Sequence, residues 1–476
     1  RFREPRGAPL KRPLLLLALA FLTAMPAHAE LTSVGLDKTQ FTSDFMIGNV
    51  VVSVIFVESN GASDANAETW SAPRKAQVLS EVMSGLDWWT RQNPRSPVSF
   101  TVLSDTASTD YEPISRPYWD EALWIPQVMA KYGQSGTRFT ATKNYVNALR
   151  QQYGADWGYV VYVVDSLNDS NGKFADGLFA YAYLGGPYLV MTYDNNGYGI
   201  SNMDVVFAHE SGHIFHALDQ YAGASSPTEY SYGYYRTING NHAYSAQAND
   251  PDSIMRGGIH WSLDKWSKQM LGWVDANNNG KDDILDRAPL VTYDSVASAG
   301  PPSFSGQTSV SVVPRQGNGL GNGLTVDTVA KVEYRLRNGT WALAEPTDGS
   351  FNGGAEAFRF NFAPGDLSAQ SINAQDVDVR VTTLYAANSA GDGSFAAASL
   401  SGAHAFPNPF KPNSGLNHTK VTFTGVGSGA RIQIFTPSGE PVFDRASRHR
   451  TLPRKPSALP RISGDEPLAR RRTRSS

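Results

Sequence analysis

The sequence predicts a multidomain protein in which one α/β domain is followed by β-sandwich domains. Three observations support this fold class. The 476 residues exceed what a single hydrophobic core ordinarily holds. Up to about residue 286, strand-like apolar runs alternate with apolar residues at helical spacing. From residue 287 onward, short alternating runs rich in Gly, Ser, Thr and Val replace the helical pattern.

The first 29 residues have the order of a secretory signal peptide. Lys11 and Arg12 precede an apolar run from Leu14 to Met25, and small residues follow up to Ala29. This run of about 12 residues is shorter than the roughly 20 that span a bilayer. We therefore expect cleavage after Ala29, a secreted chain that acts outside the cell or at its surface, and no integral membrane segment after signal removal.

Charge and cysteine content narrow the classes of function. The formal net charge is −3, so no global basic field indicates nucleic acid as a partner. The chain has no cysteine, which excludes disulfides, thiolate metal ligands and a cysteine nucleophile. An exported protein of this kind must be held together by core packing or by bound metal ions.

We assign residues 30–273 to the α/β domain. Apolar runs predict its strands, and residues such as Val78, Val82 and Leu86 predict a helix between two of them. In chain order the predicted elements are strand 49–57, helix 71–92, strand 98–103, helices 119–132 and 141–153, and strands 157–165 and 188–194. Strands that alternate with helices in this way favour one α/β domain.

A helix that begins near Asn202 carries the chemistry. His209 and His213 are four residues apart, so both imidazoles project from one helix face and can bind the same zinc ion. Glu210 follows the first histidine and is placed to contact a metal-bound water instead of the metal. The spacing therefore predicts a zinc site with Glu210 as the general base.

The sequence around these residues resembles the metzincin clan of zinc metallopeptidases. The clan extends HExxH to a third ligand, which falls here on Asp219, and adds a downstream Met-turn, matched by Met255 in DSIM. The pattern is similar to the snapalysin-like and immunoglobulin-A-peptidase-like branches. The resemblance implies a zinc-dependent endopeptidase of α+β, metzincin-like fold that hydrolyses protein or peptide substrates, with Met255 as an apolar floor beneath the ligands.

Two positions depart from the clan pattern. His216 replaces the glycine at which the chain turns toward the third ligand, so we expect a left-handed backbone at this histidine. Arg256 follows Met255 in the place where some members have a tyrosine close by. His260, Tyr221 and the tyrosine-rich loop 231–235 are the candidates for an oxyanion donor.

Two other functions remain open from the sequence. One is a gluzincin-type peptidase with Glu229 or another carboxylate as the third zinc ligand. The other is a surface- or carbohydrate-binding protein whose β modules act beside a degenerate protease domain. An intact HExxH with an acidic third ligand favours the enzyme.

Residues 274–286 have the ligand spacing of a calcium loop and form the predicted junction between domains. Oxygen ligands would come from alternate positions, with Gly280 at the sharp turn. The candidate Ca²⁺ ligands are Asp275, Asn277, Asn279, Lys281 through its carbonyl, Asp283 and Asp286. The alternative is a plain turn rich in Asn and Gly.

Three segments follow the junction. Residues 287–391 predict a β-sandwich domain. Residues 405–443 resemble part of the small immunoglobulin-like sorting modules of secreted bacterial proteins, which implies secretion machinery as a partner. Residues 444–476 are basic and rich in proline, and we predict that they are disordered.

Overall fold

The computed structural model describes residues 41–244, 252–296, 303–316, 323–336, 339–361 and 377–385, together with four short strands between residues 404 and 446. The predicted signal peptide, 1–29, and the tail beyond residue 446 lie outside the described residues. Within the described part, no helix has the length and apolar character needed to cross a bilayer.

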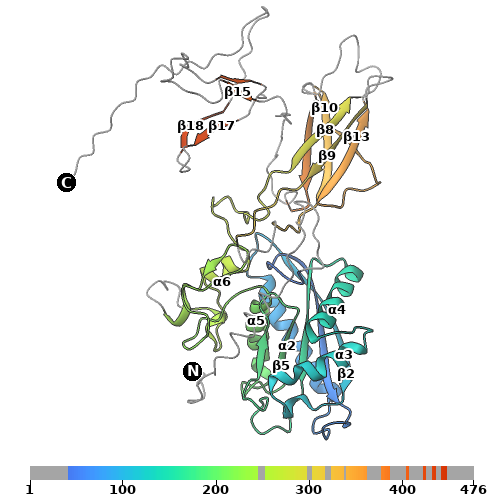
Figure 1. Ribbon diagram of the computed structural model, residues 1–476, viewed down its shortest axis with the longest axis vertical. Helices are drawn as coiled ribbons and strands as arrows, with labels where there is room; N and C mark the ends of the chain where they lie inside the picture. The colour runs from blue at the N-terminus through green and yellow to red at the C-terminus, as the bar shows by residue number, and fades with distance from the viewer. Residues whose placement is uncertain are drawn as a thin grey trace, which may run out of the picture. The chain divides into compact units, whose positions relative to one another are not determined.

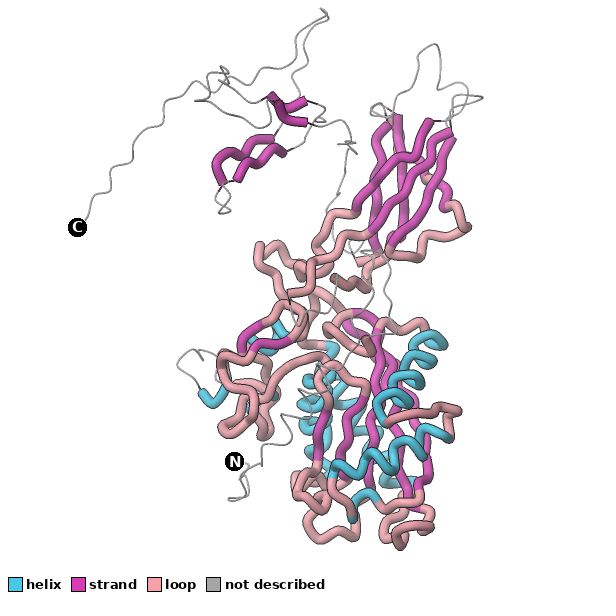
Figure 2. The backbone as a smooth tube through the Cα atoms, viewed as in Figure 1, coloured by secondary structure: helices cyan, strands magenta, loops and turns pink. Residues whose placement is uncertain are grey.

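Two compact units divide the chain. The first comprises residues up to 288 together with 310–328, and the second comprises 289–309 and the residues from 329 onward. The first unit mixes strands and helices, whereas every element of the second is a strand in the described residues (Figures 1 and 2). The mixed α/β character and the multidomain organisation predicted from the sequence are therefore confirmed.

A five-stranded sheet forms the centre of the first unit, in the order β2-β1-β3-β5-β4. Four strands are parallel, and β4 pairs antiparallel with β5 at one edge. The bounds are β1 Gly48–Ser59, β2 Val98–Thr109, β3 Trp157–Val164, β4 Ala180–Ala182 and β5 Tyr188–Thr192. All residues of β3 and β5 are buried, as expected for parallel strands covered on both faces.

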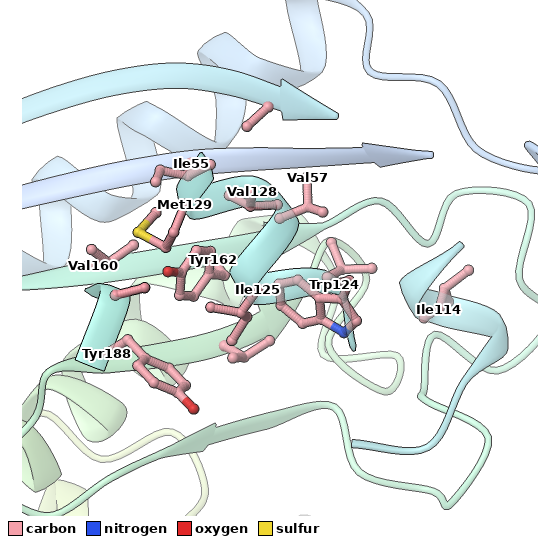
Figure 3. Packing of buried hydrophobic residues seen from close by; sticks show 14 of the residues in the cluster. Ile55, Val57, Ile114, Trp124, Ile125, Val128, Met129, Val160, Tyr162 and Tyr188 are labelled. Carbon is pink, nitrogen blue, oxygen red and sulfur yellow. The ribbon is translucent and has the colours of Figure 1, made fainter. Parts of the chain in front are cut away.

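Helices cover both faces of this sheet (Figure 1). Side chains alternate along β3: the Tyr159 hydroxyl lies 3.1 Å from that of Ser211 on α5, whereas Tyr162 faces the opposite way, toward α3 and α4. Figure 3 shows that second face, where Trp124 and Ile125 of α3 pack near Tyr162. The helices are α2 Ala72–Thr90, α3 Glu121–Ala130, α4 Arg138–Tyr153, α5 Met203–Ile214 and α6 Lys265–Met270.

Local sequence signals explain where the helices begin and end. The Ser71 side chain accepts a hydrogen bond from the Arg74 N–H and caps the first turn of α2. Thr137 caps α4 in the same way, and α4 stops at Gly154, which has a left-handed backbone. Short elements complete the unit: 3₁₀ turns Pro113–Ser115, Tyr118–Asp120, Ile200–Asn202, His242–Tyr244 and Ile254–Arg256, and the hairpin β6 Ser231–Tyr232 and β7 Thr237–Ile238.

Two antiparallel sheets make up the larger part of the second unit, in the orders β11-β10-β14 and β12-β13-β9-β8. The Tyr334 ring of β10 stacks on Phe360 of β13 with centroids 4.1 Å apart, so the sheets pack together through aromatic side chains. The bounds are β8 Leu290–Val296, β9 Ser303–Ser309, β10 Val329–Leu336, β11 Ala342–Leu343, β12 Glu345–Pro346, β13 Ala355–Asn361 and β14 Val377–Thr383.

The last four strands form two antiparallel pairs, and only their backbones are described. They are β15 His404–Phe406 with β16 Thr422–Thr424, and β17 Arg431–Phe435 with β18 Pro441–Ala446. The rest of the predicted module, 405–443, lies outside the described residues.

Candidate metal centre

Helix α5 places the two motif histidines together. They are one turn apart and their ring centroids are 4.9 Å apart. The side chains of His209 and His213 are only 12% and 10% exposed. Helix α5 packs against α2 and against strands β4 and β5 of the sheet. Gly85 on α2 makes that packing possible, since a Cβ there would lie 2.7 Å from the Phe207 ring.

Helix α5 ends at Ile214 in a Schellman turn. The Ala217 N–H donates to the Gly212 carbonyl and the His216 N–H to the His213 carbonyl, both at 2.9 Å. His216 has φ 75°, so the left-handed backbone expected from the sequence is confirmed. For a residue with a Cβ this conformation costs about 1–2 kcal/mol.

The turn carries Asp219 back to the histidines. Its Oδ1 lies 3.0 Å from His209 Nε2 and 3.2 Å from His213 Nε2. The ligand atoms of His209, His213 and Asp219 all lie within 4.8 Å of one another, and no second such group of His, Asp or Glu is found in the described residues. The three side chains therefore converge on one point.

Main-chain carbonyls fix the two imidazole rings. His209 Nδ1 donates to the Ile254 carbonyl at 2.8 Å, and His213 Nδ1 donates to the Ala217 carbonyl at 2.7 Å. Because each Nδ1 carries a proton in these bonds, each Nε2 is directed toward Asp219 and is the nitrogen that can bind a metal.

The Asp219 segment is held by neighbouring polar groups. The Tyr221 hydroxyl donates to Asp219 Oδ2 at 3.2 Å, which leaves Oδ1 facing the histidines. Asn239 Nδ2 donates to the Asp219 carbonyl at 2.8 Å, and the Gln220 N–H donates to the Met255 carbonyl at 2.8 Å. Asn239 has no local sequence signal, because it lies 20 residues from its partner.

Met255 is fully buried against α5. A Cβ on Gly212 would lie 2.8 Å from the Met255 sulfur, so the Met255 side chain packs directly on the helix at this glycine. The sulfur therefore touches the helix one residue before His213, on the stretch that joins the two histidines.

Glu210 is buried beside the histidines, with 7% of its surface exposed. Its Oε2 has no hydrogen-bond partner among the described residues, although such atoms are ordinarily satisfied. Burial raises the pKa of the Glu210 carboxyl, while the neighbouring imidazoles act in the opposite direction. An unpartnered oxygen of this kind fits a site that receives a further polar group.

Electrostatic coupling ties the three converging groups together. Burial acts to lower the pKa of His213, but the Asp219 carboxylate outweighs it and raises that pKa to about 9. The pKa of His209 is raised for the same reason, against the same effect of burial. Burial acts to raise the pKa of Asp219, yet the two imidazoles hold it well below its usual range. Such a site favours positive charge, whether protons or a divalent cation.

Comparisons with known proteins leave the family open. No family model matches the chain, and no curated protein matches it. Among solved structures, the chain is similar to wild-type OgpA from Akkermansia muciniphila, with 11% sequence identity and a TM-score of 0.23. The match covers 75% of this chain and 94% of that one. A likeness at this TM-score carries no argument about function.

The other candidate residues take up different places. Glu229 is exposed and is not part of the converging group. His260 Nδ1 lies 2.6 Å from the Asp252 carboxylate. In the loop 231–235, the Tyr232 ring lies against His216 with centroids 5.4 Å apart. Of the oxyanion candidates, Tyr221 is the one with a hydrogen bond to the converging group among the described residues, through its bond to Asp219.

Tyr198 is a residue near the centre that sequence reasoning missed. Burial raises the pKa of its phenol, a hydrogen bond with the Gly258 backbone lowers it, and the charge of Glu210 raises it. The phenol therefore interacts both with Glu210 and with the backbone at Gly258, in the loop after Met255. Its position shortly before α5 was the only sequence signal that could have indicated it.

The predicted calcium loop is closed by its own side chains. Asp275 accepts the N–H groups of Asn279 at 3.1 Å and Gly280 at 3.0 Å. Asn277 and Asn279 both donate to Asp286 Oδ2, at 3.1 and 2.7 Å. The Asp283 carboxylate accepts the Ala276 N–H at 3.2 Å, and the Lys281 N–H donates to Asn279 Oδ1. Arg95 Nη1 lies 3.5 Å from Asp275 and supplies a positive charge.

Proposed function

We propose that the chain is a secreted zinc-dependent endopeptidase of the metzincin type. One observation carries this proposal: His209, His213 and Asp219 converge beside Glu210, whose Oε2 is buried without a partner among the described residues. Two neutral imidazoles and a carboxylate are the donor set of catalytic zinc sites, which leave a fourth position open.

The histidines and Asp219 would hold the metal, and Ile254, Ala217 and Tyr221 would orient them through the hydrogen bonds described above. When bound, zinc would supply Lewis acidity, polarising the scissile carbonyl and lowering the pKa of a bound water to about 7. The Glu210 carboxylate would accept a proton from the attacking water and deliver it to the amide nitrogen as the peptide bond breaks.

Two further parts of the proposal concern the rest of the chain. The 274–286 loop would bind Ca²⁺ through the oxygen atoms of its Asp and Asn side chains. The N-terminal signal would direct the enzyme out of the cell, with the 405–443 module as a contact for secretion machinery. A degenerate enzyme would have lost part of the ligand set, whereas all three candidate ligands are present here.

Glu210→Gln tests the mechanism. The amide keeps the shape of the side chain but cannot accept the proton, so we expect about one zinc per chain and a loss of casein cleavage of roughly 10²–10⁴-fold. Zinc content is measured by elemental analysis, and cleavage by appearance of new peptide termini.

Glu229→Gln is the matched control. This exposed side chain lies outside the converging group, so zinc content and cleavage should stay at the wild-type level. Loss of zinc from Glu229→Gln would favour the gluzincin alternative. Unchanged cleavage by Glu210→Gln would remove the role assigned to Glu210.

A further inference from the structure

The turn after α5 needs support beyond its own backbone. His216 occupies a left-handed position that favours glycine, and three residues later the chain supplies Asp219 to the centre. A disfavoured backbone persists only where surrounding contacts hold it. The contacts of the His216 side chain therefore bear on the position of the third ligand.

The His216 imidazole lies in a closed slot and is 8% exposed. On one side, a Cβ at Gly185 would lie 2.7 Å from its Cε1, so only glycine leaves room for the ring. On another side, the ring lies against Tyr232. Its Nε2 points toward Asp44, whose Oδ1 is 3.4 Å away.

Asp44 is fully buried and also pairs with Arg315. Arg315 Nη2 lies 2.7 Å from Asp44 Oδ1, and its side chain is 3% exposed. The Arg315 guanidinium carbon lies 5.0 Å from the centre of the Phe41 ring. Next to Asp44, the Ser43 hydroxyl donates to the Ile214 carbonyl at 2.7 Å, which satisfies one of the carbonyls at the end of α5.

The side chains of His216, Asp44 and Arg315 form one buried set that is centred on the Asp44 carboxylate. Asp44 Oδ2, both imidazole nitrogens, and Nε and Nη1 of Arg315 have no hydrogen-bond partner among the described residues. A buried ionic group that loses its partner is strongly unfavourable. Loss of the Asp44 charge would therefore leave both the His216 imidazole and the Arg315 guanidinium without the partner that they share.

We propose that His216, Asp44 and Arg315 form a buried clamp that fixes the turn after α5 and so positions Asp219 for metal binding. The inference rests on the proposed zinc site, and it assigns the three side chains a positioning role. Two of them come from segments far from the motif in sequence: residues 41–44 before the first strand, and residues 310–316 after β9.

The test compares variants of the full chain by their zinc dissociation constant, measured by competition with a chelator. Asp44→Asn and His216→Ala should weaken zinc binding about tenfold or more. Loss of a residue that orients a metal ligand typically lowers metal affinity by about 10–100-fold, and we expect the lower end of that range. His216→Gly should bind zinc within about threefold of wild type, because glycine adopts the left-handed turn without a clamp. Asp44→Asn in the His216→Gly background should then have little further effect.

Asp165→Asn is the control for a purely structural role. Asp165 forms another buried ion pair of the first unit, with Arg74 Nη2 at 2.6 Å. This variant should lower the melting temperature and leave the zinc dissociation constant unchanged. An equal loss of zinc affinity in Asp165→Asn, or an equal effect of Asp44→Asn with histidine and with glycine at 216, would overturn the clamp.

A metal-free measurement separates the clamp from the zinc site itself. Hydrogen exchange of the Ala217 amide, which is bonded to the Gly212 carbonyl, should be faster in metal-free Asp44→Asn than in metal-free wild type. Unchanged exchange refutes the clamp. A wild-type chain that binds no zinc, with exchange as expected, refutes only the proposed function.

Discussion

Tyr221 shows how one hydroxyl sets the direction of a carboxylate. It donates to Asp219 Oδ2, and Oδ1 then faces the two histidines. The sequence suggested Tyr221 only as a candidate oxyanion donor. In the structure its hydroxyl is engaged with the third candidate ligand, which favours an orienting role.

Tyr221→Phe should weaken zinc binding by about 10–100-fold, because the Asp219 carboxylate loses the bond that orients it. The melting temperature of the metal-free chain should change little. Tyr230→Phe is the matched control, since no hydrogen bond of the Tyr230 hydroxyl is seen among the described residues. Full zinc affinity with reduced peptide cleavage in Tyr221→Phe would instead support the oxyanion role.

Among single residues, the sequence predicts the relative positions of those that are close together in the chain. The four-residue spacing of His209 and His213, and the turn at His216, follow from helix geometry. Asp44, Asn239 and Arg315 could not be predicted, because tertiary folding brings them to the site from distant segments. A single sequence carries no periodicity that links such positions.

Among the elements, strong apolar runs gave the most reliable predictions. The buried strand predicted at 49–57 is β1, and the helix predicted at 71–92 is α2. Strand β4 was not predicted, because three half-buried residues show no clear period. Helix α4 begins three residues before its predicted start, because Thr137 caps it.

The 274–286 loop allows a prediction at the scale of one element. Its side chains already converge through hydrogen bonds. Ca²⁺ bound by Asp275, Asp283 and Asp286 would stabilise the folded chain by mass action. The free energy of unfolding would rise by about 2.7 kcal/mol when the calcium concentration is a hundredfold above Kd. Millimolar calcium should therefore raise the melting temperature measured by calorimetry, and Asp275→Ala should abolish the increase.

Lys281→Ala serves as the control for the loop. The predicted ligand at this position is the main-chain carbonyl, so the calcium-dependent increase should persist without the lysine side chain. The same melting temperature in calcium and in a calcium chelator would leave only the turn interpretation.

The whole first unit is discontinuous in sequence, and this could not be predicted. Composition changes at about residue 287, but residues 310–328 belong with the earlier part of the chain. Leu324 and Val326 of this segment are buried, and so is the side chain of Arg315. The composition shift shows where the pattern of short strands begins. It cannot show that residues 310–328 fold back onto the first unit, because that depends on tertiary contacts.

Tyr234 joins that returning segment to the rest of the unit. Its fully buried hydroxyl donates to the Val313 carbonyl at 2.6 Å and accepts the Leu324 N–H at 2.8 Å. Tyr234→Phe removes both bonds and leaves the buried Leu324 N–H without this acceptor, at a cost of about 1–3 kcal/mol. The melting temperature of the full chain should fall by several degrees.

The adjacent tyrosine provides the comparison that decides this last prediction. The Tyr235 hydroxyl is buried but has no hydrogen-bond partner among the described residues, so Tyr235→Phe removes a polar group that gains nothing from folding. We expect its melting temperature to equal or exceed that of wild type. Equal losses from both variants would mean that the two hydrogen bonds of Tyr234 are not what holds residues 310–328 in the first unit.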